Sequence, residues 1–272
     1  MKGVIRCSLG MVAAAGVLAP GIVRAQPSPA LLEAPALNQA ERPAETGAAS
    51  EPGGARRFLG DVAVDYREYF SWETAAWLAA GGVTALSIHP ADEQLRDATQ
   101  DPEAALTRTL DAGSTGATYG NLSFQFPLAV GWWAIGHAVG SRRGADAGRD
   151  LVRAQISALS WTYVYKYAVD RTRPNGDPRS CPSGHASATF ATAMVLQEHY
   201  GWKVGLPVFA AAALTAASRI TVNKHWTSDV VFGAAVGMAS GRTVTLHLRQ
   251  RALVLHPLVV PGGGGVVVRV VD

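Results

Sequence analysis

Long, weakly charged segments rich in Ala, Gly and Val fill the middle of the sequence, and proline or glycine stands near most of their ends. Apolar residues make up 48% of the 272 residues and charged residues 17%, which is ample for a buried interior. Segments of this length and pattern predict helices and an all-α fold. The expected helices are Trp72 to Ile88, Ala91 to Leu110, Leu122 to Val139, Ala145 to Val169, Ala186 to Tyr200, Val204 to Ile220 and Ser228 to Arg249.

The N-terminal 56 residues differ in composition from the rest. Lys2 and Arg6 precede an apolar stretch, which predicts an export signal over residues 1–25 with cleavage before Gln26; an uncleaved membrane anchor is the alternative. Residues 26–56 are rich in Pro, Ala, Glu and Gly and predict a disordered linker. The folded domain is therefore expected over residues 57–250, outside the cytoplasm, as a periplasmic or membrane-associated protein.

The last residues are two Val-rich runs on either side of Pro261 and four glycines. This pattern predicts a C-terminal β-hairpin within residues 251–272, with a disordered tail as the alternative. No chemistry is expected there.

The charge pattern argues against a nucleic-acid partner, because the formal net charge is only +3 and no dense run of Lys and Arg occurs. Most uncharged runs are shorter than the roughly 20 apolar residues of a simple membrane-spanning helix. The pattern slightly favours a water-soluble helical domain over a membrane-embedded or membrane-attached one.

Cysteine is scarce. Cys7 lies inside the expected signal, so Cys181 is the single thiol of the mature chain and an intramolecular disulfide is excluded. We interpret Cys181 as a packed thiol, with a nucleophile as the less favoured alternative.

Three cationic residues stand in a fixed order along the sequence. Arg173 and Arg219 offer planar donor forks that match two phosphate oxygens, and Lys166 adds a point charge. Each alone is an ordinary surface cation. Together they can neutralise a phosphate dianion and the extra charge of its transition state.

A Pro-Ser-Gly-His turn precedes one of the Ala-rich helices. The N–H groups of Ser183 and Gly184, the Ser183 hydroxyl and the positive end of the helix can converge on an anion, and His185 is then placed beside it. A plain helix cap by Ser183 is the alternative.

His225 and Asp229 are four residues apart. On a helix this spacing places both on one face, so Asp229 is expected to hydrogen-bond one ring nitrogen and leave the other aimed at phosphorus. His225 would then be the nucleophile. Nearby, Asp170-Arg171 is interpreted as a solvated pair, and Trp226 as a packing residue that could wall the pocket.

These segments resemble the signature of the type 2 phosphatidic acid phosphatase superfamily, which also contains bacterial acid phosphatases and vanadium haloperoxidases. The signature comprises Lys166, Arg173-Pro174, Pro182-Ser183-Gly184-His185, Ser218-Arg219, His225 and Asp229, and every position matches. The resemblance implies a compact bundle of about six core helices. It also implies that His225 forms a phosphohistidine while His185 protonates the leaving alcohol and later activates water, without a metal ion.

The favoured function is a metal-independent phosphatase acting on phosphomonoesters, with lipid phosphates such as phosphatidate or a polyprenyl diphosphate preferred as substrates. The alternatives are a soluble acid phosphatase acting on small phosphomonoesters, a vanadium-dependent haloperoxidase, and an anion-binding protein without turnover. Vanadate would be a cofactor only in the haloperoxidase, and the short chain argues against that reading.

Overall fold

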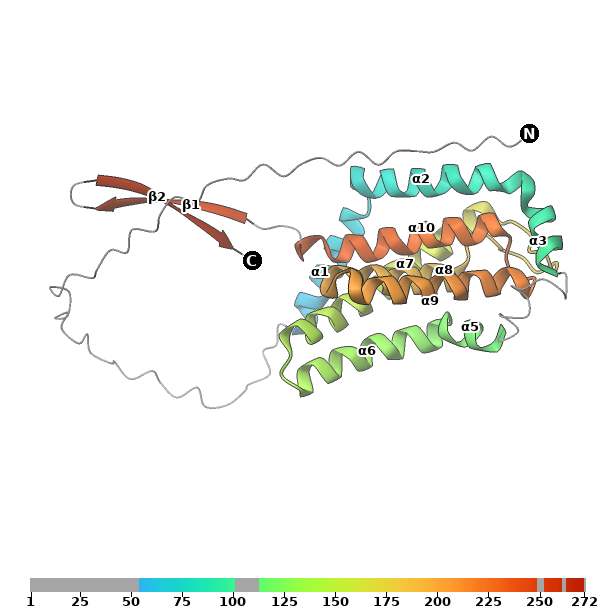
Figure 1. Ribbon diagram of the computed structural model, residues 1–272, viewed down its shortest axis with the longest axis horizontal. Helices are drawn as coiled ribbons and strands as arrows, with labels where there is room; N and C mark the ends of the chain where they lie inside the picture. The colour runs from blue at the N-terminus through green and yellow to red at the C-terminus, as the bar shows by residue number, and fades with distance from the viewer. Residues whose placement is uncertain (1–53, 101–112, 249–251, 261–262, 272) are drawn as a thin grey trace, which may run out of the picture. The chain divides into compact units, whose positions relative to one another are not determined.

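The computed structural model describes residues 54–100, 113–248, 252–260 and 263–271 (Figure 1). The expected signal over residues 1–25 and nearly all of the expected linker lie outside these ranges. Helix α1 (Gly54–Glu68) begins within the last residues assigned to that linker. The helical region therefore starts slightly earlier than composition indicated.

The all-α prediction is confirmed, with two helices that the sequence pattern did not predict, α1 and α5. Within the described residues, the helical elements other than α1 are α2 (Trp72–Ile88), η2 (His89–Ala91), α3 (Asp92–Gln100), α5 (Gly113–Tyr119), α6 (Leu122–Ala138), α7 (Arg142–Val169), α8 (Gly184–Tyr200), α9 (Trp202–Thr221), α10 (Thr227–Val244) and η3 (Leu246–Leu248). The last expected helix is shorter than predicted, because it ends at Val244 and not at Arg249.

A β-hairpin follows the helices, as the Val-rich runs predicted. Strand β1 (Ala252–Val260) pairs antiparallel with β2 (Gly263–Val271), and the register places Ala252 opposite Val271 and Val260 opposite Gly263.

Polar caps explain where several helices begin. The side chains of Ser71, Asn121 and Ser141 accept backbone N–H groups at the first turns of α2, α6 and α7. Helix α7 ends at Val169, and its C-cap residue, Asp170, adopts a left-handed conformation with φ 43°. Pro127 lies inside α6 and does not delay its start.

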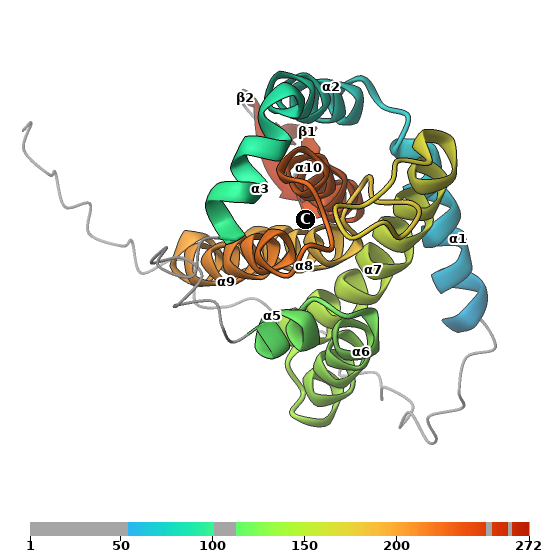
Figure 2. The same cartoon turned by 90° about the vertical axis from the view of Figure 1, so that its right-hand side faces the viewer.

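Helix α10 packs against α2, α7 and α8, while α9 packs against α8 and α6 against α7 (Figure 2). Glycines make the contact between α8 and α10 unusually close. A Cβ atom on Gly237 would lie 2.2 Å from the Ser187 carbonyl oxygen, and one on Gly233 would lie 2.6 Å from the Ser183 carbonyl oxygen. The Pro-Ser-Gly-His turn is therefore held directly against α10.

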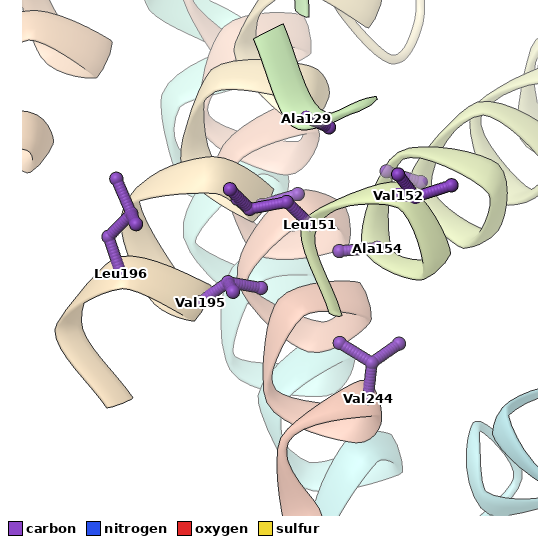
Figure 3. Close-up of a cluster of buried hydrophobic side chains, with 9 residues drawn as sticks. Ala129, Leu151, Val152, Ala154, Val195, Leu196 and Val244 are labelled. Atoms are coloured by element: carbon purple, nitrogen blue, oxygen red, sulfur yellow. The ribbon is translucent and has the colours of Figure 1, made fainter. Parts of the chain in front are cut away.

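The main apolar core joins α6, α7, α8 and α10 (Figure 3). Leu151 and Val195 are 1% and 0% exposed at its centre. Polar side chains continue the core toward the turn: Gln155 donates to the Ala188 carbonyl and to Thr192, and Thr192 donates to Gln125. These bonds fix α6, α7 and α8 relative to one another.

Large apolar side chains also remain exposed on several helices. They include Trp72, Val83, Leu86, Phe124, Ile135, Val139, Tyr163, Val164, Tyr167, Trp202, Leu206 and Leu214. Within the described ranges, α9 is the one helix long and apolar enough to cross a membrane, and 33% of its apolar window is buried. A single such helix is a weak indication, because a core helix of a soluble protein passes the same test.

Candidate active site

Residues from all three signature segments line one cavity of about 240 Å³. The cavity lies among α6, α7, α8, the end of α9 and the segment before α10. Its signature residues are Lys166, Arg173, Gly184, His185, Arg219 and His225. Ser183 and Asp229 are buried next to these residues but do not line the cavity.

The three cations reach the cavity from separate elements. Lys166 is in the last turn of α7, Arg173 is in the following loop, and Arg219 is in the last turn of α9. Burial, with Arg173 as the second cause, lowers the pKa of Lys166 to about 8. The same two causes lower the pKa of Arg219. The cations therefore repel one another, as expected of a site that binds an anion.

The Pro-Ser-Gly-His turn does not supply all the donors that we expected. The Ser183 N–H is already bonded to the Asp229 carbonyl at 3.0 Å, so the expectation that it binds an anion was wrong. The Ser183 hydroxyl makes no cap hydrogen bond and has no partner. Helix α8 begins at Gly184, so the unpaired N–H groups of its first turn lie beside the cavity.

His185 is oriented by α5. Its Nε2 lies 3.1 Å from the Ala117 carbonyl oxygen, so Nε2 carries a proton that it donates to this oxygen. Burial, followed by the Arg219 charge, lowers the pKa of His185 to about 4. The ring is consequently neutral at pH 7 when the cavity holds no anion.

His225 is 3% exposed and precedes α10. Burial is the largest cause that holds its pKa well below the ordinary value, and Lys166, Arg173 and Arg219 add to it. A neutral imidazole keeps a lone pair available for attack. The structure thus gives His225 the protonation state that a nucleophile needs.

The expected helical pairing of His225 with Asp229 was wrong. Helix α10 begins at Thr227, so His225 lies outside it. Asp229 is instead the third residue of that helix and caps its N-cap residue, Trp226: its Oδ2 accepts the Trp226 N–H at 3.0 Å and the Ser180 hydroxyl. The His225 Nδ1 is buried and makes no hydrogen bond to Asp229, while the Ser180 backbone interacts with the ring and opposes the fall in its pKa. Asp229 therefore holds the backbone next to His225, and not its ring.

Arg171 was also misread as part of a solvated pair. It donates to Asp229 and to Asp92, each at 2.9 Å, while Asp170 lies 3.8 Å from Arg179. Sequence reasoning missed Asp92 entirely, because it lies outside the signature. The one feature of the sequence that could have pointed to this ion-pair cluster was the position of Arg171 within the Lys166 to Arg173 segment.

Three buried polar atoms at the site lack partners: Ser183 Oγ, Arg219 Nε and His225 Nδ1. Buried polar atoms in folded proteins nearly always have a partner, so a cluster of such atoms calls for an explanation. A tetrahedral oxyanion bound in the cavity can accept from the Arg219 guanidinium, which lines it. The arrangement can therefore bind a phosphate group and present a neutral imidazole to it.

Cys181 is set apart from this chemistry. Burial, with the Asp229 carboxylate second, raises the pKa of its thiol to about 12, so the thiol stays protonated. This favours the packed-thiol interpretation. In the parts of the chain that the structure describes, no three His, Cys, Asp or Glu side chains cluster as metal ligands.

Known proteins resemble the same region. The family model of the PAP2 superfamily matches residues 150–252. The lipid A 1-phosphatase of Porphyromonas gingivalis is 41% identical over 80 residues, which are 28% of this chain and 18% of that protein. The lipid A 4'-phosphatase of Helicobacter pylori is 34% identical over 79 residues, which are 29% of this chain and 40% of that protein. The chain thus spans less than half the length of either curated relative.

A solved structure shares the fold. The first transmembrane PAP2 type phosphatidylglycerolphosphate phosphatase from Bacillus subtilis aligns with a TM-score of 0.56 and 20% identity, covering 66% of this chain and 98% of that one. At this identity the likeness concerns the fold alone. With the complete signature and the family match in place, residues 150–252 of this chain resemble the PAP2 superfamily, and the helical domain shares the fold of the solved structure.

Proposed function

We propose that this protein is a phosphatase that hydrolyses phosphate monoesters, with lipid phosphates as its substrates, by a metal-independent mechanism. One observation carries the proposal: three cations and two imidazoles with lowered pKa values line one small cavity, and unpartnered buried polar atoms lie at or next to it. Such a constellation suits phosphoryl transfer, because catalysis there rests on positioning and on charge stabilisation.

Substrate binding would relieve the repulsion among the cations. A phosphate dianion placed between Arg173 and Arg219 can take two donors from each fork, and Lys166 contributes a further charge. The same anion would raise the pKa of His185 above its anion-free value of about 4. His185 would therefore become protonated when the substrate binds.

In the first step, a lone pair of His225 attacks phosphorus and the bond from phosphorus to the alcohol oxygen breaks. His185 gives its proton to that oxygen, so the alcohol leaves neutral. In the second step, His185 takes a proton from water as the water oxygen attacks phosphorus. The bond from phosphorus to His225 then breaks, which releases inorganic phosphate and restores both imidazoles.

Apolar surface at the cavity favours a lipid over a small ester. Leu122, Ala158 and Leu159 line the cavity beside the cations, and Tyr163, at the same wall, is 52% exposed. Apolar surface therefore continues from the cavity to the outside of the bundle. The curated relatives are named for lipid A, and the solved relative for phosphatidylglycerolphosphate. We infer that the exposed apolar faces associate with a membrane, and that an export signal places the site outside the cytoplasm.

The test is phosphate release by the full chain in mild detergent with a chelator present. Phosphatidate in mixed micelles and p-nitrophenyl phosphate serve as lipid and soluble substrates. We expect faster turnover of the lipid. His225→Ala should lower kcat at least about a thousandfold, as loss of a nucleophile does. His137→Ala is the matched control, because His137 is exposed on α6 and contacts Trp133, outside the cavity, through a hydrogen bond to its carbonyl and an edge contact with its ring.

Three other outcomes of these assays would contradict part of the proposal or favour an alternative function. Sustained turnover by His225→Ala would remove His225 as nucleophile. Faster turnover of the soluble ester, with the protein extracted without detergent, would favour a soluble acid phosphatase. Bromide oxidation by peroxide with added vanadate, in the absence of hydrolysis, would identify a haloperoxidase.

A further inference from the structure

Behind the cavity, one arginine links two buried carboxylates from different helices. Asp92 begins α3 and is 2% exposed, and Asp229 in α10 is 0% exposed. Arg171 donates from Nη2 to Asp92 Oδ2 and from Nη1 to Asp229 Oδ1, both at 2.9 Å. We call Asp92, Arg171 and Asp229 the carboxylate clamp.

The Asp229 end of the clamp holds both loops that carry the proposed catalytic histidines. Its carboxylate accepts the Trp226 N–H at 3.0 Å, next to His225. It also accepts the Ser180 hydroxyl, and its backbone carbonyl accepts the Ser183 N–H at 3.0 Å. A shift of Asp229 would therefore move the backbone on both sides of the cavity.

The Asp92 end holds the start of α10 through Ser228. Asp92 Oδ1 accepts the Ser228 N–H at 3.0 Å, and its Oδ2 accepts the Ser228 hydroxyl. Arg171 Nη1 also donates to that hydroxyl at 2.8 Å. Asp92 thus fixes the guanidinium and the first turn of α10 together.

The clamp requires an arginine for geometric reasons. The guanidinium uses separate nitrogens for the two carboxylates, and a lysine ammonium cannot reproduce this fork. The clamp carries one more negative than positive charge. Loss of Arg171 would leave two buried carboxylates without their counter-ion, which is strongly unfavourable.

We propose that Arg171 and Asp92 are positioning residues of the active site: they hold Asp229, and through it the two loops that carry His185 and His225. Neither Arg171 nor Asp92 lines the cavity, so they act without touching the substrate. This inference rests on the proposed function, which it deepens with residues outside the signature.

The experiment compares Arg171→Lys, Asp92→Asn and their double variant with wild type, in steady-state hydrolysis and in hydrogen exchange. We expect each single change to lower kcat by about 10- to 100-fold, as displacements of about 1 Å do, with KM within about threefold. The double variant should lose less kcat than the product of the two single fold-losses, because both changes act on Asp229. Exchange should rise at residues 180–185 and 225–229.

Arg96→Gln is the matched control, because both Arg171 and Arg96 lie over the Trp226 ring, at 5.1 and 5.5 Å, but Arg96 pairs with exposed Asp97. It should leave kcat and exchange unchanged. The inference would be overturned if Arg171→Lys and Asp92→Asn both kept the wild-type kcat, or if they raised KM and left kcat normal. It would also be overturned if the fold-losses of kcat from the two single changes multiplied in the double variant. If Arg171→Lys does not fold, kcat and hydrogen exchange of the isosteric Asp92→Asn variant test the inference alone.

The two proposals can fail separately. A wild type without hydrolysis would overturn the proposed function, whereas local exchange that rises in Arg171→Lys and not in Arg96→Gln would still support the clamp. An active wild type with unchanged exchange and kcat in both clamp variants would overturn the clamp alone.

Discussion

Gly120→Ala is expected to displace the His185 ring and to reduce turnover while the protein remains folded. Gly120 directly follows α5 and lies against α8 and α9. A Cβ atom at this position would lie 2.8 Å from His185 Cδ2, 2.9 Å from His185 Cβ and 2.6 Å from Thr215 Cγ2. One of these neighbours must move.

The size of the effect follows from these distances. Carbon atoms in contact prefer a separation of about 3.5–4.0 Å, so the added methyl is about 1 Å too close. Thr215 is 3% exposed and has little room to yield. The ring would move by about 1 Å and lose its 3.1 Å bond to Ala117. A displacement of this size costs about 100-fold in kcat, and the overpacking costs about 1–3 kcal/mol of unfolding free energy.

The assay measures kcat and KM with a soluble phosphomonoester, together with the unfolding midpoint in urea. Gly131→Ala is the control, because Gly131 lies in α6 and its added Cβ would meet no atom within 4 Å. It should keep full activity and gain up to about 1 kcal/mol from helix propensity. A Gly120→Ala variant with kcat within about twofold of wild type would refute the position assigned to His185.

Three further predictions concern charge and packing. The pKa of Lys166, about 8, means that its charge is lost as pH rises past that value, so the inhibition constant of inorganic phosphate should rise between pH 7 and 9; a flat profile would contradict this. Because the pKa values of His185 and His225 lie below 6.5, the unfolded chain takes up protons that the folded chain does not, and the melting temperature should fall from pH 7 to pH 5. His185→Asn should reduce that slope, and an unchanged slope would count against the buried neutral ring. Gly237→Ala places a Cβ 2.2 Å from the Ser187 carbonyl and should cost about 2 kcal/mol or more in urea unfolding, whereas wild-type stability would show that α8 and α10 are less tightly packed.

Local signals accounted for most of the fold. Helix α2 has the bounds that the sequence indicated, Trp72–Ile88, because Ser71 caps its start and the chain turns at Pro90 soon after its end. The hairpin followed from its Val-rich runs and glycines. Helix α5 was missed because its short Gly- and Thr-containing segment has no apolar periodicity. It is nevertheless the element that orients His185.

The spacing of residues along the sequence predicted which side chains line the cavity, but it did not predict the hydrogen bonds and ion pairs around them. The four-residue interval between His225 and Asp229 predicted a shared helical face, yet the extended Trp226 ends that regularity and Asp229 caps the helix. The partner of Arg171 lies 79 residues away in the sequence, at Asp92. No pattern along the chain indicates such a contact, because it depends on how α3 packs near α10.

The site therefore separates its charges into two layers. The cavity layer holds Lys166, Arg173 and Arg219 around neutral imidazoles, and it is short of anions. The clamp layer has one surplus negative charge, but its Asp229 carboxylate already accepts the Trp226 N–H of one loop and the Ser180 hydroxyl of the other. Asp229 favours the charged form of Lys166, but burial and Arg173 outweigh it and lower the Lys166 pKa. The three cations therefore still suit a phosphate ester as their counter-ion. The same arrangement explains why the Asp229 carboxylate need not touch the His225 ring: a protonated imidazole would add a fourth positive charge to a crowded cavity, whereas a neutral ring can attack phosphorus.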